Sequence, residues 1–225
     1  MNISVIIPTL NEERCIWHTL APLQHLRMGG HEIILSDGGS DDRTVELAEP
    51  LVDRVVTSPP GRAIQMNQGA AVATGEVLWF LHADTIVPAT AYIPLLSCLD
   101  GGTKVWGRFN VRLSGHQAMF RLIEMMMNLR SCITGIATGD QGIFLLRHTF
   151  EQLGGFTQIP LMEDIALSKK LKIISRPACI KRKIVTSSRR WEKQGIFTTI
   201  LLMWRLRLAF FFGVSAERLA AKYNP

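Results

Sequence analysis

The sequence predicts an α/β protein with a mostly parallel central sheet covered by helices on both faces. Short apolar runs such as ISVII at 3–7 and VLWFL at 77–81 are typical of strands buried on both sides. Between the runs, apolar residues recur at helical spacing, and polar turns separate the segments. Strands that alternate with helices favour right-handed crossovers, and therefore parallel strands.

The first half alternates regularly. The first strand is expected at 3–7 and to end at Pro8, after which Thr9 and Glu12 have the spacing of a capping box. A helix through Ile16 and Leu26 follows. Further strands are expected at 31–36, 53–57 and 77–81, with helices at 44–48 and 63–73.

The second half is less regular. Strands are expected at 104–113, 142–147 and 180–187, and helices at 116–130 and 164–171. Because strands and helices stop alternating, we expect a nucleotide-binding half followed by a C-terminal half with a mixed arrangement, shaped for a second substrate. We expect one catalytic domain at 1–195.

The C-terminal segment, 196–225, is expected to be an amphipathic helical appendage. Nine residues, Ile196 to Trp204, precede its first charge, well short of the ~20 that a membrane-spanning helix needs. Arg205 and Arg207 interrupt the apolar run. Packing on the domain and contact with a membrane surface both explain such a segment.

Composition indicates an ordinary globular protein, with 47% apolar and 20% charged residues in 225. The net charge of +6 suits anionic partners such as phosphates or acidic lipids. Seven Lys or Arg and one acid lie in 176–193, but no nucleic-acid recognition motif accompanies them, so no nucleic-acid partner is expected.

The four cysteines show no metal-binding spacing and are expected to be free thiols in a reducing compartment. The N-terminal residues read as a strand rather than a signal peptide. We therefore expect a cytoplasmic protein, with a peripheral position at the inner face of the membrane left open.

Polar side chains follow three of the predicted strands, at the sheet edge where parallel α/β proteins bind ligands. Asp84, directly after a buried strand, needs a cation, hydrogen-bond donors or solvent to offset its desolvation. A divalent metal shared with nucleotide phosphates is one answer. Taken singly, Thr9, Glu12 and the Gly38–Gly39 pair are explained equally well by helix capping and turn geometry.

These segments together resemble the family 2 glycosyltransferases, which have the GT-A fold, a Rossmann-like sheet. ISVIIPTLNEE at 3–13 and DGGSDDRT at 37–44 resemble the family's first two nucleotide-binding turns. The stretch 61–85 is similar to the approach to the metal-binding DxD motif, and 154–172 to the acceptor loop with its ED pair. Among subgroups, the sequence looks closest to the arsenosugar-biosynthesis and radical-SAM/selenodomain-associated transferases.

The resemblance implies transfer of a sugar from a UDP- or GDP-sugar to the hydroxyl of a small or lipid-linked acceptor, with inversion. Asp164, beside Glu163, would be the general base, and Asp84 would hold Mg²⁺ or Mn²⁺ against the diphosphate. The residues implied to line the nucleotide-sugar pocket are Pro8, Thr9, Asn11, Glu12, Asp37, Arg62, His82, Asp84, Gly139, Asp140, Gln141, Arg190 and Trp191.

The sequence departs from the family pattern at two places. His82 stands where DxD has its first acid, so it either contacts ribose or metal or is a structural histidine. No glutamine begins the basic-aromatic motif around Arg190 and Trp191, which favours transfer of a single sugar. Alternatives are a sugar-phosphate nucleotidyltransferase, which lacks support because no glycine-rich loop follows the first strand, and a non-catalytic basic membrane-surface module.

Overall fold

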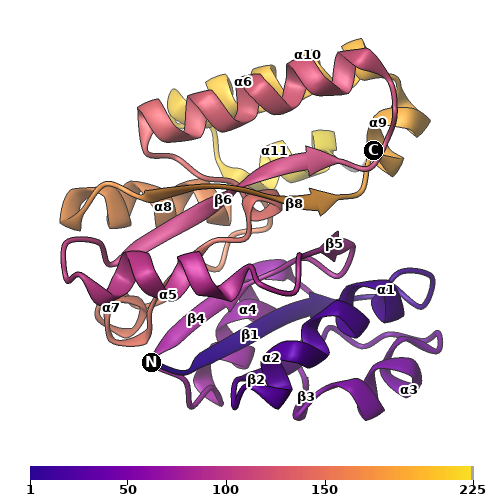
Figure 1. The fold of residues 1–225 in the computed structure, drawn as a ribbon. Helices are drawn as coiled ribbons and strands as arrows, with labels where there is room; N and C mark the ends of the chain where they lie inside the picture. The colour runs from indigo at the N-terminus through magenta and orange to yellow at the C-terminus, as the bar shows by residue number, and fades with distance from the viewer. Residues whose placement is uncertain (224–225) are drawn as a thin grey trace.

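β1 (Ile3–Thr9) runs through the middle of a parallel block in the computed structural model, which describes residues 1–223 (Figure 1). It pairs in parallel with β2 (Glu32–Asp37) and β4 (Val77–Phe80), and β3 (Arg54–Thr57) extends β2. In register, Thr9 lies beside Asp37, so the carboxyl ends of β1 and β2 meet. The α/β prediction with its parallel first half is confirmed.

The second half of the sheet is mixed, as expected. β7 (Phe144–Leu146) is antiparallel to both β4 and β6 (Trp106–Leu113), and β6 is parallel to β8 (Ala178–Thr186). Within residues 1–223 the strand order is β3-β2-β1-β4-β7-β6-β8-β5, with β5 (Thr85–Ile86) at one edge.

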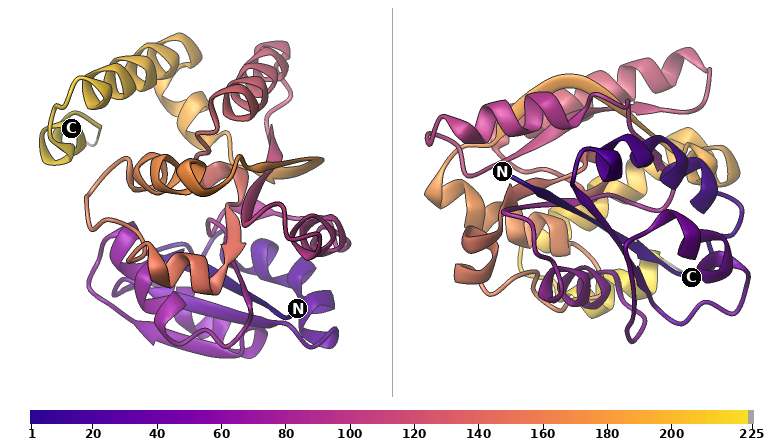
Figure 2. Two further views of the ribbon diagram at one scale, coloured as in Figure 1. Left: turned by 90° about the vertical axis from the view of Figure 1, so that its left-hand side faces the viewer. Right: turned by 60° about the horizontal axis from the view of Figure 1, so that its bottom comes forward.

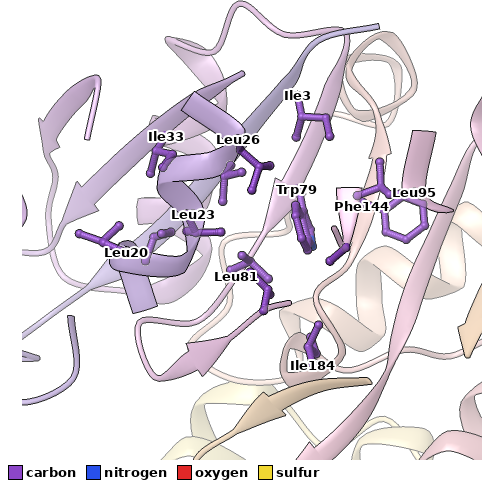
Figure 3. Packing of buried hydrophobic residues seen from close by; sticks show 14 of the residues in the cluster. Ile3, Leu20, Leu23, Leu26, Ile33, Trp79, Leu81, Leu95, Phe144 and Ile184 are labelled. Carbon is purple, nitrogen blue, oxygen red and sulfur yellow. The ribbon is translucent and has the colours of Figure 1, made fainter. Parts of the chain in front are cut away.

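Helices cover both faces of the sheet, because successive side chains of β1 point to opposite faces and both sets are apolar. Val5 and Ile7 face a core shared with α1 (Ile16–Leu20), η1 (Ala21–Leu23), α2 (Gln24–Met28), α3 (Thr44–Ala48) and α5 (Tyr92–Asp100). Figure 3 shows Leu20, Leu23 and Leu26 of this layer near Ile33. Ile6 faces a second core shared with α4 (Arg62–Ala71), α7 (Arg147–Gln152) and α8 (Glu163–Ile174).

The capping box predicted at Thr9 and Glu12 is wrong. β1 continues through Pro8 to Thr9, whose hydroxyl donates to Asp37 Oδ1 at 3.2 Å instead of capping a helix. The helix expected through Leu26 is divided into α1, η1 and α2, because Pro22 lies at the start of η1 and has no N–H to continue the ladder.

Several short elements follow no strong pattern and were not predicted: η2 (Glu49–Leu51), α5, β5, α7 and α9 (Arg189–Gln194). η3 (Gly139–Gln141) is held by a capping box between Thr138 and Gln141. The sequence does carry a signal for it, because Thr138 and Gln141 have the threonine-to-glutamine spacing of that box.

The C-terminal segment forms α10 (Ile196–Phe211) and α11 (Ala216–Tyr223), which bury Leu206 and Leu219 against Leu161, Met162 and Ile165. α10 and α6 (Ala118–Thr134) lie at the same end of the molecule, above the sheet in Figure 1 and in the left view of Figure 2. Across residues 1–223, every helix is too short or too polar to cross a membrane.

Candidate active site

A cavity of about 310 Å³ opens beside the carboxyl end of β4. Its wall combines side chains from η3, the first turn of α8, α9 and α10, which are far apart in the sequence. Nine of the predicted site residues line it: Arg62, His82, Asp84, Gly139, Asp140, Glu163, Asp164, Arg190 and Trp191. The volume is at the lower end of the range of small-molecule pockets.

Asp164 lies in the first turn of α8 and is fixed by two backbone donors. Gly139 N–H donates to Oδ2 at 2.9 Å, and Ile165 N–H donates to Oδ1 at 2.7 Å. Burial in the cavity wall and the neighbouring charge of Glu163 raise the pKa of Asp164 to about 6, although Arg62 and the two N–H donors act in the opposite direction. A carboxyl with this pKa can exchange a proton near neutral pH.

Glu163 is buried, with its side chain 2% exposed, and is paired with Arg62. Arg62 Nη1 lies 3.1 Å from Glu163 Oε1, so the pair joins α4 to α8 across the cavity. Two adjacent carboxylates of α8 therefore have different surroundings, because Glu163 has a guanidinium partner while Asp164 has only backbone donors.

His82 and Asp140 form an ion pair on the cavity wall, with Nδ1 3.3 Å from Oδ1. Burial, the largest single effect, lowers the pKa of His82, but the hydrogen bond to Asp140 and the charges of Asp140 and Asp84 together outweigh it and raise the pKa overall. Burial acts to raise the pKa of Asp140, but the hydrogen bond and charge of His82 lower it. Gly139 permits the arrangement, because a Cβ there would overlap His82 Nε2.

Asp84 and Glu12 share one arginine. Arg189 Nη2 lies 3.2 Å from Glu12 Oε2 and 3.5 Å from Asp84 Oδ2, joining α9 to the ends of β1 and β4. The side chain of Asp84 is 25% exposed at the cavity, so its carboxylate is accessible. Residues 1–223 bring together no group of three His, Cys, Asp or Glu side chains able to hold a metal.

The predicted residues at and just after the ends of β1 and β2 lie outside the cavity wall, where the two turns bind each other. Asp37, 3% exposed, accepts hydrogen bonds from the N–H groups of Gly39 and Ser40 at 2.9 and 2.8 Å, and from the hydroxyl of Thr9. Asn11 has a positive φ of 55°, and its Oδ1 accepts from Asp41 N–H at 3.0 Å. Pro8, next to Thr9, is partly buried at the same strand end. These contacts fix the two turns against each other at the strand ends.

Three further predicted residues have structural contacts. Gln141 is fully buried, and its amide donates to Ser131 Oγ at 2.9 Å, which holds η3 against α6. Arg190 lies 3.4 Å above the ring of Tyr223 and donates to the Tyr223 carbonyl at 2.7 Å. Trp191 lines the cavity and packs against Phe120 and its neighbours.

Among the cavity residues that were not predicted are Arg189, Arg207 and Tyr223. The basic run that ends at Lys193 was a signal for Arg189, which adjoins the predicted Arg190. Arg207 and Tyr223 belong to helices whose position over the cavity depends on tertiary packing, and nothing local in the sequence indicates it.

The sequence profile of Glycosyl transferase family 2 matches residues 4–153. The chain is similar to a PGL/p-HBAD biosynthesis glycosyltransferase of Mycobacterium bovis, with 25% identity over 91% of this chain and 97% of the relative. Among solved structures it is similar to S. aureus TarS (residues 1–349), with a TM-score of 0.66, 19% identity and coverage of 84% of this chain and 61% of that one. A second TarS structure contains UDP-GlcNAc.

The mannosyltransferase PcManGT of Pyrobaculum calidifontis, solved with GDP-Man and Mn²⁺, has a TM-score of 0.67 and 21% identity, over 92% of this chain and 61% of that one. These likenesses confirm the GT-A fold, and the profile covers most of the parallel half and the cavity residues up to Asp140. The family match argues against the two alternatives, a nucleotidyltransferase and a non-catalytic module. The chain belongs to Glycosyl transferase family 2 and is a glycosyltransferase that uses a nucleotide-sugar donor.

Proposed function

We propose that this glycosyltransferase transfers one sugar to an acceptor hydroxyl with inversion, and that Asp164 is the general base. The observation that carries the proposal is the position of Asp164 on the cavity wall, fixed by Gly139 and Ile165, with a pKa raised to about 6. An acceptor hydroxyl is a weak nucleophile until a positioned base removes its proton. A single unpaired carboxylate suits a direct displacement at the anomeric carbon, because Glu163 is occupied by Arg62.

The donor is proposed to be a UDP- or GDP-sugar that spans two regions. Its diphosphate and sugar would lie in the cavity, and its nucleoside would lie at the ends of β1 and β2, near Pro8, Thr9, Asn11, Glu12 and Asp37. The position of Arg189 between Glu12 and Asp84 supports this division, because it links the end of β1 to the cavity. TarS and PcManGT, solved with UDP-GlcNAc and GDP-Man, have the same fold.

A divalent cation, Mg²⁺ or Mn²⁺, is part of the proposal. Asp84 fits as its protein ligand because its carboxylate is accessible at the cavity, while diphosphate oxygens would complete the donor set. His82 Nε2 is buried and has no hydrogen-bond partner among residues 1–223, so it is a second candidate. When bound, the cation would neutralise charge that develops on the leaving diphosphate. Arg189 would then release Asp84 and be available to the diphosphate.

Two narrower points also remain proposals. The first is that the chain belongs with the arsenosugar-biosynthesis and radical-SAM/selenodomain-associated transferases, a likeness that identifies no substrate. We also propose that the C-terminal segment, 196–225, contacts the inner face of a membrane, because α10 exposes large apolar side chains. The acceptor is proposed to be a small or a lipid-linked molecule.

The test is a turnover assay with a panel of UDP- and GDP-sugars, measured as release of nucleoside diphosphate with Mn²⁺, with Mg²⁺ and with chelator. We expect release with one donor class, only with a cation, and an inverted anomeric configuration in the product by NMR. Turnover unaffected by chelator would remove the metal from the proposal, and a retained configuration would exclude a single displacement.

A further inference from the structure

α10 has an apolar stripe that the protein leaves uncovered. Its exposed residues recur at alternating spacings of four and three, which places them along one side of the helix. The opposite side buries Thr199 and Leu206. The stripe consists of Phe197, Leu201, Trp204, Leu208 and Phe211, followed by Phe212 at the C-cap, and each is between 59% and 74% exposed.

α6 has a second stripe of the same kind. Phe120 and Ile123 face inward against Leu113, whereas the outer side exposes apolar residues at helical spacing. These are Leu122, Met125, Met126, Leu129 and Ile133, each between 46% and 63% exposed. The two stripes hold eleven of the twenty large exposed apolar side chains in residues 1–223. We call them together the apolar face.

The two stripes lie at one end of the molecule. α6 and α10 are both at the top of Figure 1 and of the left view of Figure 2, above the sheet and α8. Each helix buries the side that faces the rest of the chain, so the uncovered sides face outward. An exposed apolar surface of this extent marks a site of interaction.

Charge indicates the partner. α10 contains no acid, and the acid of α6, Glu124, is buried and paired with Arg121 at 2.9 Å. Arg205 is exposed beside the α10 stripe, and Lys193 is exposed just before the helix. Aromatic and aliphatic residues bordered by cations are typical of helices that lie in the interface of an anionic membrane. A symmetric contact between two copies would use the same acid-free surface on both sides, so it would offer these cations no acidic partner there.

α10 also connects this face to the cavity. Met203 and Arg207 line the cavity from the flank of α10 between the stripe and the buried side, and Thr199 lines it from the buried side. A molecule with an apolar tail in the bilayer would therefore reach the cavity wall with its polar head, close to Asp164. A water-soluble acceptor would gain nothing from this arrangement.

We propose that the apolar face docks on an anionic membrane surface and that the acceptor is the polar head of a lipid-anchored molecule. This inference rests on the proposed glycosyl transfer and identifies the class of acceptor. It extends the membrane contact from the C-terminal segment to α6, which lies outside it.

The docking is tested by flotation with vesicles of phosphatidylcholine alone and of phosphatidylcholine with phosphatidylglycerol. Wild type should bind the anionic vesicles more strongly, and Leu201→Glu with Trp204→Glu should weaken that binding by about tenfold or more. Leu129→Glu on α6 should weaken it independently. Ile173→Glu is the matched control, because Ile173 is 84% exposed on α8, outside the apolar face, and should bind as wild type does.

Circular dichroism and donor turnover show whether each variant is folded. Deletion of α10 is not a suitable test, since it would uncover Leu161, Met162 and Ile165. Equal vesicle binding by wild type and the folded stripe variants would overturn the docking. A wild-type dimer that the stripe variants dissociate, together with no vesicle binding, would assign the face to a second copy.

The acceptor is tested with the radiolabelled donor that supports turnover and a total lipid extract of the source organism in vesicles. Label should move into the organic phase on extraction, and the stripe variants should lose this transfer while retaining donor hydrolysis. Label that enters only water-soluble product would overturn the lipid acceptor. If wild type turns over no donor at all, the proposed function fails instead, so the two failures are distinguishable.

Discussion

The guanidinium of Arg62 lies 3.1 Å from the carboxylate of Glu163, which leaves the adjacent Asp164 as the cavity carboxylate without a side-chain cation partner among residues 1–223. This pairing separates the roles of two neighbouring acids. Glu163 is paired with its arginine, and the charge of Glu163 contributes to the raised pKa of Asp164.

Replacement of the base should abolish most turnover. Asp164→Asn should lower kcat by about 10²–10⁴-fold with little change in donor Kd, because the amide keeps the volume of the carboxylate but cannot accept a proton. Single-turnover kinetics and donor titration measure the two quantities. A kcat within a few-fold of wild type would leave Asp164 only its role in holding Gly139 and Ile165.

The same variant should change stability in a pH-dependent way. The folded-state pKa of Asp164 is about 6, above the ordinary aspartate value of about 4, so its contribution to stability is present at low pH and is lost as pH rises between the two. The Tm of Asp164→Asn minus the Tm of wild type should therefore increase as the pH rises from about 4 to about 6. Thermal unfolding at a series of pH values tests it, and a constant difference would contradict the raised pKa.

Glu163→Gln should shift the pH dependence of catalysis. In wild type, kcat/KM should fall below about pH 6 as the base becomes protonated. Removal of the Glu163 charge takes away one cause of the raised pKa and frees Arg62, so this limb should move to lower pH. Glu163→Asp, which keeps the charge, is the control, and an identical limb in the glutamine variant would show that Glu163 does not act on Asp164.

Asp84→Ala should abolish cation-dependent donor binding while the fold is kept. Its ion pair with Arg189 is partly exposed, so its loss should have little effect on Tm. Isothermal titration of the donor with and without Mn²⁺ gives the comparison, and Asp100→Ala, exposed at the end of α5, is the matched control. Donor affinity that stays cation-dependent in Asp84→Ala would remove Asp84 as the metal ligand.

Gly139→Ala should reduce turnover through the position of His82. An added Cβ overlaps His82 Nε2, so the imidazole or η3 must move, and Gly139 also donates the N–H that holds Asp164. Gly101→Ala is the matched control, since it has open space and an ordinary φ of −74°. Turnover of both variants at the wild-type rate would show that the His82–Gly139 contact does not position the site.

The sequence was sufficient to predict the sheet because β1, β2 and β4 are apolar runs buried on both faces, a local property. It also identified nine residues of the cavity wall, because the family's motifs lie at strand and helix ends. The capping box at Thr9 failed for a physical reason. The same hydroxyl can cap a helix or bond Asp37, and only the register of β1 and β2 decides between them.

Residues that enter the site through tertiary packing could not be predicted. Arg207 reaches the cavity because α10 packs on Leu161 and Met162, a contact between distant segments. Arg189 pairs with Glu12 and Asp84 from the other end of the chain, and charge composition alone assigns no partner to an arginine.

The three-residue strand β7 also has a consequence for how local the strand contacts are. It joins β4 to β6 in the described sheet, so the two halves of the site are connected through it. The parallel block through Phe80 pairs among near neighbours in the chain, so its strand contacts are more local than those of the second half. The turns proposed to hold the nucleoside therefore belong to the block that pairs within residues 3–80, whereas Asp164 lies beyond the short strand that connects the two halves.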